Sequence, residues 1–396
     1  MWLEYGIAKD GDYLSVAQVP RGKTDLKCPY CGGELTAKKG KIKAHHFAHT
    51  HQTCLAVGRS TDIPKLPCYD KFNLHLSGKE LEALAYLWDE YGVNNWRFHS
   101  GNKNLINQGL IKFNKYRGSG GSYEFTKKGK IPFGALSLNL FNQIQEPWIL
   151  KRLQKLEEKI ERLCKDNLNE KENLVLLEEA LIDIRIYCLQ IQRILSQNLY
   201  FLEIKAEQGV FHKIGVTTRT INARVGEIQK ELTKHFGKVE IKVLGTWAHR
   251  GNVEPYFKHR YRQWKYPIDS LTEYFQFDDV KPVLRDLRRM KPKVLGMPEK
   301  LILTGGITTT ESRGLTVIKI AERSESIKTG MKRAQAWGTK IGRPKGGETP
   351  QEFLSKPSTQ RVIAALEEGL SLRKAALAAK VSVNTVRKVK AALEQP

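Results

Sequence analysis

The sequence lacks any long apolar run. No stretch approaches the roughly 20 apolar residues that a membrane helix requires, and the opening residues MWLEYGIAKDGDYLS do not have the layout of a signal peptide. We therefore expect a cytoplasmic protein with no membrane partner. In that reducing compartment the six Cys residues are predicted to be thiols or metal ligands rather than disulfides.

Acidic residues are also scarce relative to basic ones. The chain has 42 Asp and Glu against 66 Lys and Arg, a formal net charge of +24. So large an excess favours an extended polyanion as partner, and we predict double-stranded DNA and a nucleoid-associated protein. The alternative is a solvated basic surface. With 396 residues the chain is long enough for two to four domains, and its patterns predict a multidomain α+β protein.

Two Cys and His pairs near the N-terminus have the spacing of metal ligands. Cys28 and Cys31 form a C-x-x-C pair, and His46 and His49 form an H-x-x-H pair beyond a predicted hairpin at 34–47. Two thiolates and two imidazoles complete a tetrahedral Zn²⁺ site with no open position, as structural sites require. Further candidate ligands lie close by, namely His45, His51 and Cys54.

The segments CPYC and HHFAH resemble the zinc ribbon that opens CoiA-type competence proteins. The resemblance covers residues 1–60. It implies a nucleic-acid-associated module and brings no catalytic residues.

Residues 70–135 resemble a winged-helix module. Ser77 and Glu80 stand in capping-box register. A short helix, a strand, a GSGG tip at Gly118–Gly121 and a second strand follow. DNA contact by this wing and a purely structural role both remain open. The helix before them has an apolar face formed by Leu81, Leu84, Leu87 and Trp88.

Residues 149–196 carry two heptad seams separated by DNLNEKEN. Each seam is too narrow to be stable alone in water. The pattern predicts an antiparallel helical hairpin, with an intermolecular coiled coil as the alternative. The seam positions are Ile149, Leu153, Leu156, Ile160 and Leu163, then Leu174, Leu177, Leu181, Ile184, Cys188, Ile191 and Leu195.

Residues 198–290 alternate between strand and helix patterns. Two strands joined by an AEQG turn precede a helix, a third strand, a second helix and a short last strand. The expected elements are 199–205, 210–217, 221–232, 239–249, 252–264 and 272–277.

This order resembles the GIY-YIG endonuclease domain, an α/β sandwich with a small antiparallel sheet. Tyr200 in NLY fills the family's first triplet, and Lys213 to Gly215 in KIG fill the second. Arg224 matches the Arg of the first helix, and Glu254 matches the metal-binding Glu of a later helix. The resemblance implies hydrolysis of a phosphodiester at one metal ion.

The residue types suit that chemistry. Glu254 would hold Mg²⁺ or Mn²⁺, and Arg224 would offer a planar fork to the phosphate. Tyr200 would activate the nucleophile, deprotonated or through water, and Gly215 permits close approach of the backbone. Lys213 stands where the founding motif has Tyr, which leaves its role open. Taken singly, each residue also has an ordinary structural explanation.

Residues 305–346 resemble the long helix and basic linker of serine recombinases. Ala321-Glu322-Arg323 and the GRPK segment carry the resemblance, whereas a resolvase-type nucleophilic Ser region is missing, so recombination is not expected. Because the corresponding helix of serine recombinases forms dimers, this resemblance allows a homodimer. Arg343 and Lys345 are predicted to enter the minor groove, or else to form a flexible linker.

Residues 356–396 are predicted to form three helices with a helix-turn-helix, a generic three-helix bundle being the alternative. Ser371 caps the second helix and Ser382 the third. The third helix would read the major groove. The predicted DNA contacts are Asn384, Thr385, Arg387, Lys388 and Lys390.

Together these patterns predict a metal-dependent DNA endonuclease tethered to DNA by its zinc, basic-arm and helix-turn-helix modules, of mobile-element, phage or homing type. The alternative is a catalytically inactive DNA-binding regulator or architectural protein.

Overall fold

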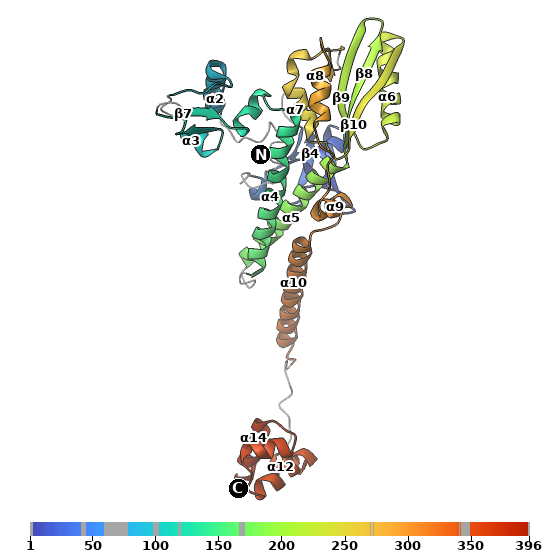
Figure 1. The fold of residues 1–396 in the computed structure, drawn as a ribbon. Coiled ribbons are helices and arrows are strands. Elements are labelled where there is room, and N and C mark those ends of the chain that lie inside the picture. Colours follow the sequence, from blue (N-terminus) through green and yellow to red (C-terminus); the bar gives the residue numbers. More distant parts are fainter. Residues whose placement is uncertain are drawn as a thin grey trace. The chain divides into compact units, whose positions relative to one another are not determined.

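The chain forms two compact units, Met1–Ala321 and Glu322–Pro396, drawn in Figure 1. Both are described separately below. Helices are mixed with small antiparallel sheets, as predicted, and none of the described helices has the length and apolar content to cross a bilayer. The computed structural model describes residues 3–40, 45–58, 78–97, 103–117, 120–165, 171–269, 271, 273–339, 341 and 349–394.

The first unit begins with a five-stranded antiparallel sheet in the order β2-β1-β3-β4-β5. The predicted hairpin forms, because Leu35 pairs with His49 and Lys38 with His46. Leu35 and Phe47 are buried in a small core of their own. The elements are β1 (Tyr5–Ile7), β2 (Tyr13–Ser15), η1 (Val16–Gln18), β3 (Gly22–Lys27), β4 (Glu34–Lys38), β5 (His46–His49) and α1 (Leu55–Gly58).

Two helices and a two-stranded sheet come next, in the order that the winged-helix pattern predicts. Leu84 and Leu87 are buried, whereas Leu81, expected on the same apolar face, is 45% exposed. Ser77 and the Gly118–Ser119 part of the predicted wing lie outside the described residues. The elements are α2 (Gly78–Tyr91), α3 (Lys103–Asn107), β6 (Ile111–Asn114), β7 (Ser122–Phe125) and η3 (Lys128–Phe133).

Two long helices, α4 (Leu138–Lys165) and α5 (Lys171–Ser196), pack along the predicted heptad seams (Figure 1). Apolar side chains of the two seams pack against each other within one chain. The Tyr187 hydroxyl donates a hydrogen bond to the Ile149 carbonyl at 3.0 Å. Helix α4 starts well before the expected Ile149, because Leu138 and Phe141 continue its apolar face into the core below the central sheet. A short helix, α9 (Met297–Leu303), packs on α5.

The central sheet has the strand order β10-β8-β9-β11. Side chains alternate along β8, so Leu199 and Phe201 face α7, whereas Tyr200 and Leu202 face α6. The two central strands, β8 and β9, are therefore buried on both faces, whereas β10 is largely exposed, and α6 runs along one face of the sheet in Figure 1. The elements are β8 (Asn198–Ala206), β9 (Gly209–Thr217), α6 (Ile221–Phe236), β10 (Val239–Trp247), α7 (Val253–Arg260), η4 (Arg262–Trp264), β11 (Tyr274–Phe275) and α8 (Lys281–Arg288).

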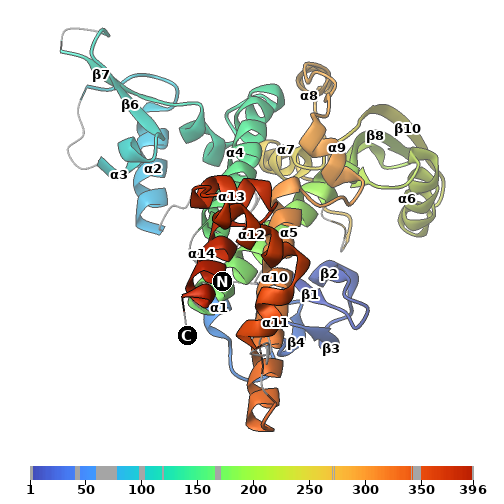
Figure 2. The same cartoon turned by 90° about the horizontal axis from the view of Figure 1, so that it is seen from below.

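A long helix, α10 (Thr309–Ala336), begins in the first unit and ends in the second. The helices after it cluster around a core with Val362, Ala375 and Val386 (Figure 2). One helix more than predicted forms, since Thr349 and Glu352 make a capping box ahead of the three expected helices. Arg343 and Lys345 lie outside the described residues. The helices are α11 (Pro350–Ser355), α12 (Pro357–Glu367), α13 (Leu372–Ala378) and α14 (Val383–Leu393).

Candidate functional site

Three of the predicted catalytic residues meet on the α6 face of the central sheet. Tyr200 pairs across the hairpin with Gly215, and its ring covers the space where a side chain at Gly215 would lie. Arg224 reaches down from α6 and donates from Nε to the Tyr200 hydroxyl at 3.3 Å. The sheet register and the position of Arg224 in the first turns of α6 thus bring these residues together.

A chain of four charges joins the other two predicted residues, Lys213 and Glu254, to each other. Lys213 Nζ lies 3.0 Å from Glu273 Oε2 and 4.2 Å from the centre of the Tyr274 ring. Lys258 Nζ bridges Glu273 Oε1 at 2.8 Å and Glu254 Oε1 at 3.0 Å. Lys213 and Glu254, from β9 and α7, are therefore joined through two residues that the sequence analysis did not single out.

The electrostatics decide which of these groups is charged. Burial raises the pKa of the Tyr200 phenol, Arg224 opposes the rise, and the Glu273 and Glu254 carboxylates add to it. Tyr200 is thus protonated at neutral pH. Burial lowers the pKa of Lys213, and Glu273 opposes this. Although burial works against ionisation, Lys258 and Lys213 lower the pKa of Glu273 to about 2.

The contacts of Glu273 depend on the pairing of β11 with β9, which the sequence does not reveal. In that pairing Tyr274 stands opposite Lys213 and brings its neighbour Glu273 alongside Lys213 and Lys258. Glu227 was missed too. It accepts from Arg224 NH1 at 2.9 Å and also pairs with Arg219. Glu273 has no sequence signal, because its partners Lys213 and Lys258 are distant in the chain. Glu227 and Lys258 lie one helical turn from Arg224 and Glu254, and this spacing could have identified them.

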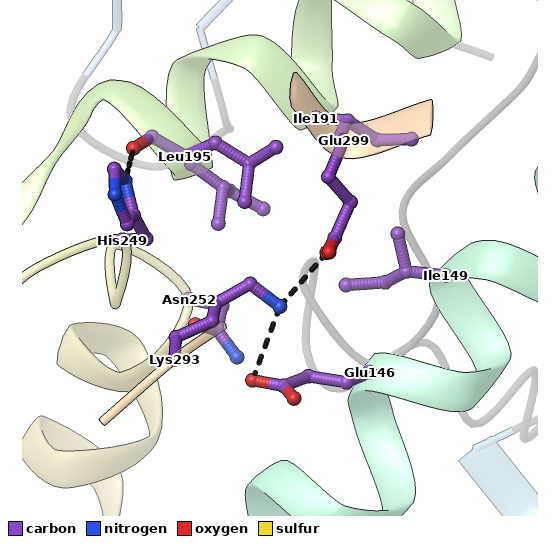
Figure 3. Close-up of a pocket in the computed structure, with 9 residues that line it drawn as sticks. Glu146, Ile149, Ile191, Leu195, His249, Asn252, Lys293 and Glu299 are labelled. Atoms are coloured by element: carbon purple, nitrogen blue, oxygen red, sulfur yellow. Dashed lines mark hydrogen bonds and ion pairs between the residues drawn. The ribbon is translucent and has the colours of Figure 1, made fainter. Parts of the chain in front are cut away.

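The start of α7, and with it Glu254, is anchored on the helical hairpin (Figure 3). Asn252 is buried and donates to the Asn142 side chain at 2.9 Å. Lys293 lies between Glu146 and Glu299, at 3.5 and 2.8 Å, and the three charged groups point toward one another in the figure. These contacts fix the loop from β10 into α7 and so determine where the Glu254 backbone lies.

Four metal-ligand side chains converge in the N-terminal sheet. The ligand atoms of Cys28, Cys31, His49 and Cys54 all lie within 4.8 Å of one another, and Cys31 Sγ is 3.3 Å from His49 Nε2. In a tetrahedral zinc site with Zn–S bonds of roughly 2.3 Å, the sulfurs are about 3.8 Å apart. This Cys₃His set therefore fits a structural Zn²⁺.

Cys54 occupies the fourth position, to which the sequence analysis assigned His46. His46 and His49 both lie on β5, where residues three apart point to opposite faces of the sheet. The predicted hairpin already contained this information, because an H-x-x-H pair shares one face on a helix but not on a strand. Cys54, just before α1, comes back to the same side as Cys28.

The sequence of the zinc module matches a known family. The family model of the competence protein CoiA N-terminal domain matches residues 15–56. All four clustered ligands fall within this match to the CoiA domain. No curated protein and no solved structure matches the chain.

The CoiA-type module is held to the helical hairpin through its Cys knuckle. Tyr30, between the two cysteines, donates its hydroxyl to Asp183 Oδ1 of α5 at 2.9 Å. Cys28 N donates to Gly33 O and Gly32 N to Cys28 O, so the knuckle is a tight turn. Burial raises the pKa of the Cys28 thiol to about 12, and only a cation such as Zn²⁺ would make it a thiolate at neutral pH.

The last helix of the chain presents the predicted DNA-contacting residues. Asn384, Arg387 and Lys388 are exposed on α14, whereas Val386 is buried on its other side. Thr385 also takes part in the helix cap, since its backbone N–H donates to Ser382 Oγ and its hydroxyl lies 2.9 Å from Ser382 Oγ. Lys390 is exposed, with its Nζ 3.8 Å from Glu394.

Gly215→Ala is expected to disrupt the Tyr200–Arg224 contact. An added Cβ would lie 2.3 Å from the Tyr200 hydroxyl oxygen, so the buried ring must move at a cost of about 1–3 kcal/mol. Thermal unfolding measures this loss. Gly226→Ala is the matched control, because a Cβ there meets nothing within 4 Å. Equal melting temperatures for the two variants would contradict the packing described above.

Proposed function

We propose that the chain is a metal-dependent DNA endonuclease of the GIY-YIG type whose cutting centre is formed by Tyr200, Arg224 and Glu254. The observation that carries the proposal is the contact of Arg224 Nε from α6 with the Tyr200 hydroxyl of β8 at 3.3 Å, with the Glu254 carboxylate of α7 near enough to add to the rise in the Tyr200 pKa. Tyr200 and Arg224 are 24 positions apart (224 − 200), and Arg224 and Glu254 are 30 positions apart (254 − 224). A sheet and helices packed for structural reasons alone would not require these three residue types at these positions.

Glu254 is the residue that would hold the metal. Mg²⁺ in nucleases is bound by one or two carboxylates together with waters and a phosphate oxygen, and Glu254 with Glu273 beside it supplies such donors. When bound, the cation neutralises charge that develops on the phosphate. Manganese has the same preference for oxygen ligands.

The chain's own residues bind and orient the substrate. The Arg224 side chain is one-third exposed and charged, and its planar fork can accept a phosphate. Tyr200 is protonated, so it acts by orienting the attacking water rather than as a phenolate base. Hydrolysis forms a new P–O bond to that water, which releases a proton to solvent, and breaks the P–O bond to the leaving nucleotide, whose oxygen takes up a proton from solvent. Lys213, tied to Glu273, holds the cluster together.

Three flanking elements would bring DNA to this centre. The CoiA match carries the word competence in its name, which fits a role in handling DNA. The exposed basic face of α14 fits the major groove. The long helix α10, which leads into a basic segment, fits a recombinase-type arrangement in which two chains pair on DNA. An element of mobile-element, phage or homing type would combine such parts.

A second candidate function is an inactive DNA-binding regulator. The observation that favours it is Lys258, whose ammonium lies between Glu254 and Glu273 where a cation would sit. Incubation of supercoiled plasmid with Mg²⁺ or Mn²⁺ separates the two candidates. Nicked or linear product, absent in EDTA, supports the nuclease; tight DNA binding without any cleavage supports the regulator.

Arg387→Ala is expected to weaken binding of duplex DNA and to lower the slope of log affinity against log salt by about 1, because one phosphate or base contact on α14 is lost. Electrophoretic or anisotropy titrations at several salt concentrations measure both. Arg361→Ala, an equally exposed Arg on α12, is the control. Indistinguishable titrations for the two variants would exclude α14 as the DNA-reading helix.

A further inference from the structure

A basic groove lies between the β6–β7 sheet and the start of α4, away from the cluster of Tyr200 and Glu254. It encloses about 750 Å³, within the roughly 300–1,000 Å³ of ligand-binding pockets. Lysines line it from two sides: Lys112 on β6, and Lys127, Lys128 and Lys130 at the turn where η3 begins. The indole of Trp148, on α4, forms part of its wall.

The turn that carries these lysines is fixed. Gly129 packs so closely on β6 that an added Cβ would lie 2.0 Å from the Leu110 carbonyl oxygen. Thr126 donates its hydroxyl to the Gly109 carbonyl at 2.6 Å and accepts from Gly129 N at 3.1 Å. Backbone packing and hydrogen bonds therefore fix the turn from which these lysines reach the groove.

The charge of the groove is not balanced from within. Among the described residues, Glu124 is the one acidic residue that lines the groove, and it forms ion pairs with Lys112 at 2.8 Å and with Arg117 at 3.2 Å. These contacts lower the pKa of Glu124. Lys127 and Lys130 form no ion pair with any acid in the part of the chain that the structure describes. Concave like-charged surfaces of this kind concentrate anions.

The Trp148 ring adds a second recognition element. Lys128 Nζ lies 5.0 Å from the ring centre and donates to the Gln108 carbonyl at 2.8 Å, which places a cation beside a half-exposed aromatic face. Phosphates on lysines and a base on an aromatic ring are the two contacts by which proteins hold a single nucleic-acid strand. Bases inside a duplex are already stacked and cannot use the ring.

We propose that this lysine groove, formed by Lys112, Lys127, Lys128, Lys130 and Trp148, binds a single strand of DNA. The choice of DNA as the polyanion rests on the proposed function, but the groove itself needs no cleavage. A strand held here is separate from the duplex that α14 would read. The protein would thus distinguish unpaired from paired DNA by different surfaces.

Binding in EDTA tests the groove without any nuclease activity. A fluorescent 15-nucleotide strand is titrated with the full chain and followed by anisotropy. Lys127→Ala/Lys130→Ala is expected to weaken binding at least tenfold and to lower the salt slope by about 1.4, which corresponds to two phosphate contacts on a single strand. Trp148→Leu is expected to weaken it roughly 5- to 150-fold through the lost stacking.

The control is Lys79→Ala/Lys115→Ala, which removes two exposed lysines outside the groove on the same part of the chain. A strand containing 5-iododeoxyuridine is also cross-linked by light, and the cross-linked peptide is expected to contain Trp148. Equal affinities for the two double variants, or cross-links only elsewhere, would overturn the proposal. So would a preference for duplex DNA, RNA or an acidic peptide that the groove variants abolish.

The outcomes also separate this proposal from the nuclease. Single-strand binding that is lost in the groove variants, in a chain that never cuts plasmid, leaves the groove assigned and rejects the nuclease. Cleavage with no groove-dependent binding does the reverse. Thermal melts of each variant confirm that the fold is unchanged.

Discussion

Glu254→Gln is expected to lower Mg²⁺-dependent plasmid cleavage by roughly 10²–10³-fold or more, the loss typical of removing one strong electrostatic contact from a reaction centre. The amide keeps the size of the side chain but cannot supply an anionic ligand. It also leaves Lys258 with one carboxylate partner, Glu273, instead of two. Initial rates of nicking across a range of Mg²⁺ concentrations measure the loss.

DNA affinity should not change in the Glu254→Gln variant, because we assign the binding of duplex DNA to the basic face of α14 and not to Glu254. Glu240→Gln, an exposed acid on β10, is the matched control and should cut at the wild-type rate. Wild-type nicking by Glu254→Gln would reject Glu254 as the metal ligand. Loss of both cleavage and DNA binding would instead point to a folding defect, which a melting curve identifies.

Cys54→Ser is expected to remove zinc from the protein, whereas His46→Ala should keep about one Zn²⁺ per chain. The structure groups Cys54 with Cys28, Cys31 and His49, and a structural zinc site needs all four ligands closed around the metal. Because zinc binding contributes directly to folding free energy in small modules, the N-terminal core should also open. Metal analysis of purified protein and limited proteolysis of residues 3–58 follow the two effects.

The contrast between Cys54 and His46 makes this test decisive. Zinc retained in Cys54→Ser and lost in His46→Ala would restore the H-x-x-H assignment and contradict the geometry of β5. The opened module should also lose its contact between Tyr30 and Asp183. Asp183→Asn is useful here, since it weakens that contact without touching a ligand and should leave the zinc content unchanged.

Local pattern predicted much of the architecture. The hairpin, the two long helices and the succession of strands and helices after Tyr200 followed from alternation and heptad spacing, because burial of one face imposes a period on the sequence. The order of the strands within the sheet did not. Element ends were less predictable. Helix α4 begins at Leu138 rather than Ile149 since its first turns bury Phe141 against Tyr256, with ring centres 4.0 Å apart, a contact between residues far apart in the chain.

The candidate site divides in the same way. Tyr200, Lys213, Gly215, Arg224 and Glu254 were all named from their order. The structure brings Tyr200, Gly215 and Arg224 together and joins Lys213 to Glu254 through Glu273 and Lys258. Glu273 was not, because its ion pairs with Lys213 and Lys258 join separate elements and leave no periodic pattern in the sequence. Lys258 was not named either, although it stands four residues after Glu254 on α7. The lysine groove is a similar case: Lys127, Lys128 and Lys130 are adjacent in sequence, but only tertiary packing sets Trp148 beside them.

By itself the sequence determined the basic charge, the Cys and His pairs, the helical seams and the residue types of the proposed cutting centre, all of which depend on composition or on a short local period. Only the tertiary structure decided that Cys54 and not His46 completes the zinc ligands, and that Lys258 and Glu273 join Lys213 to Glu254. The physical reason is the same in both cases. Which side of a strand a residue faces, and which distant charge meets it there, is set by sheet register and helix packing.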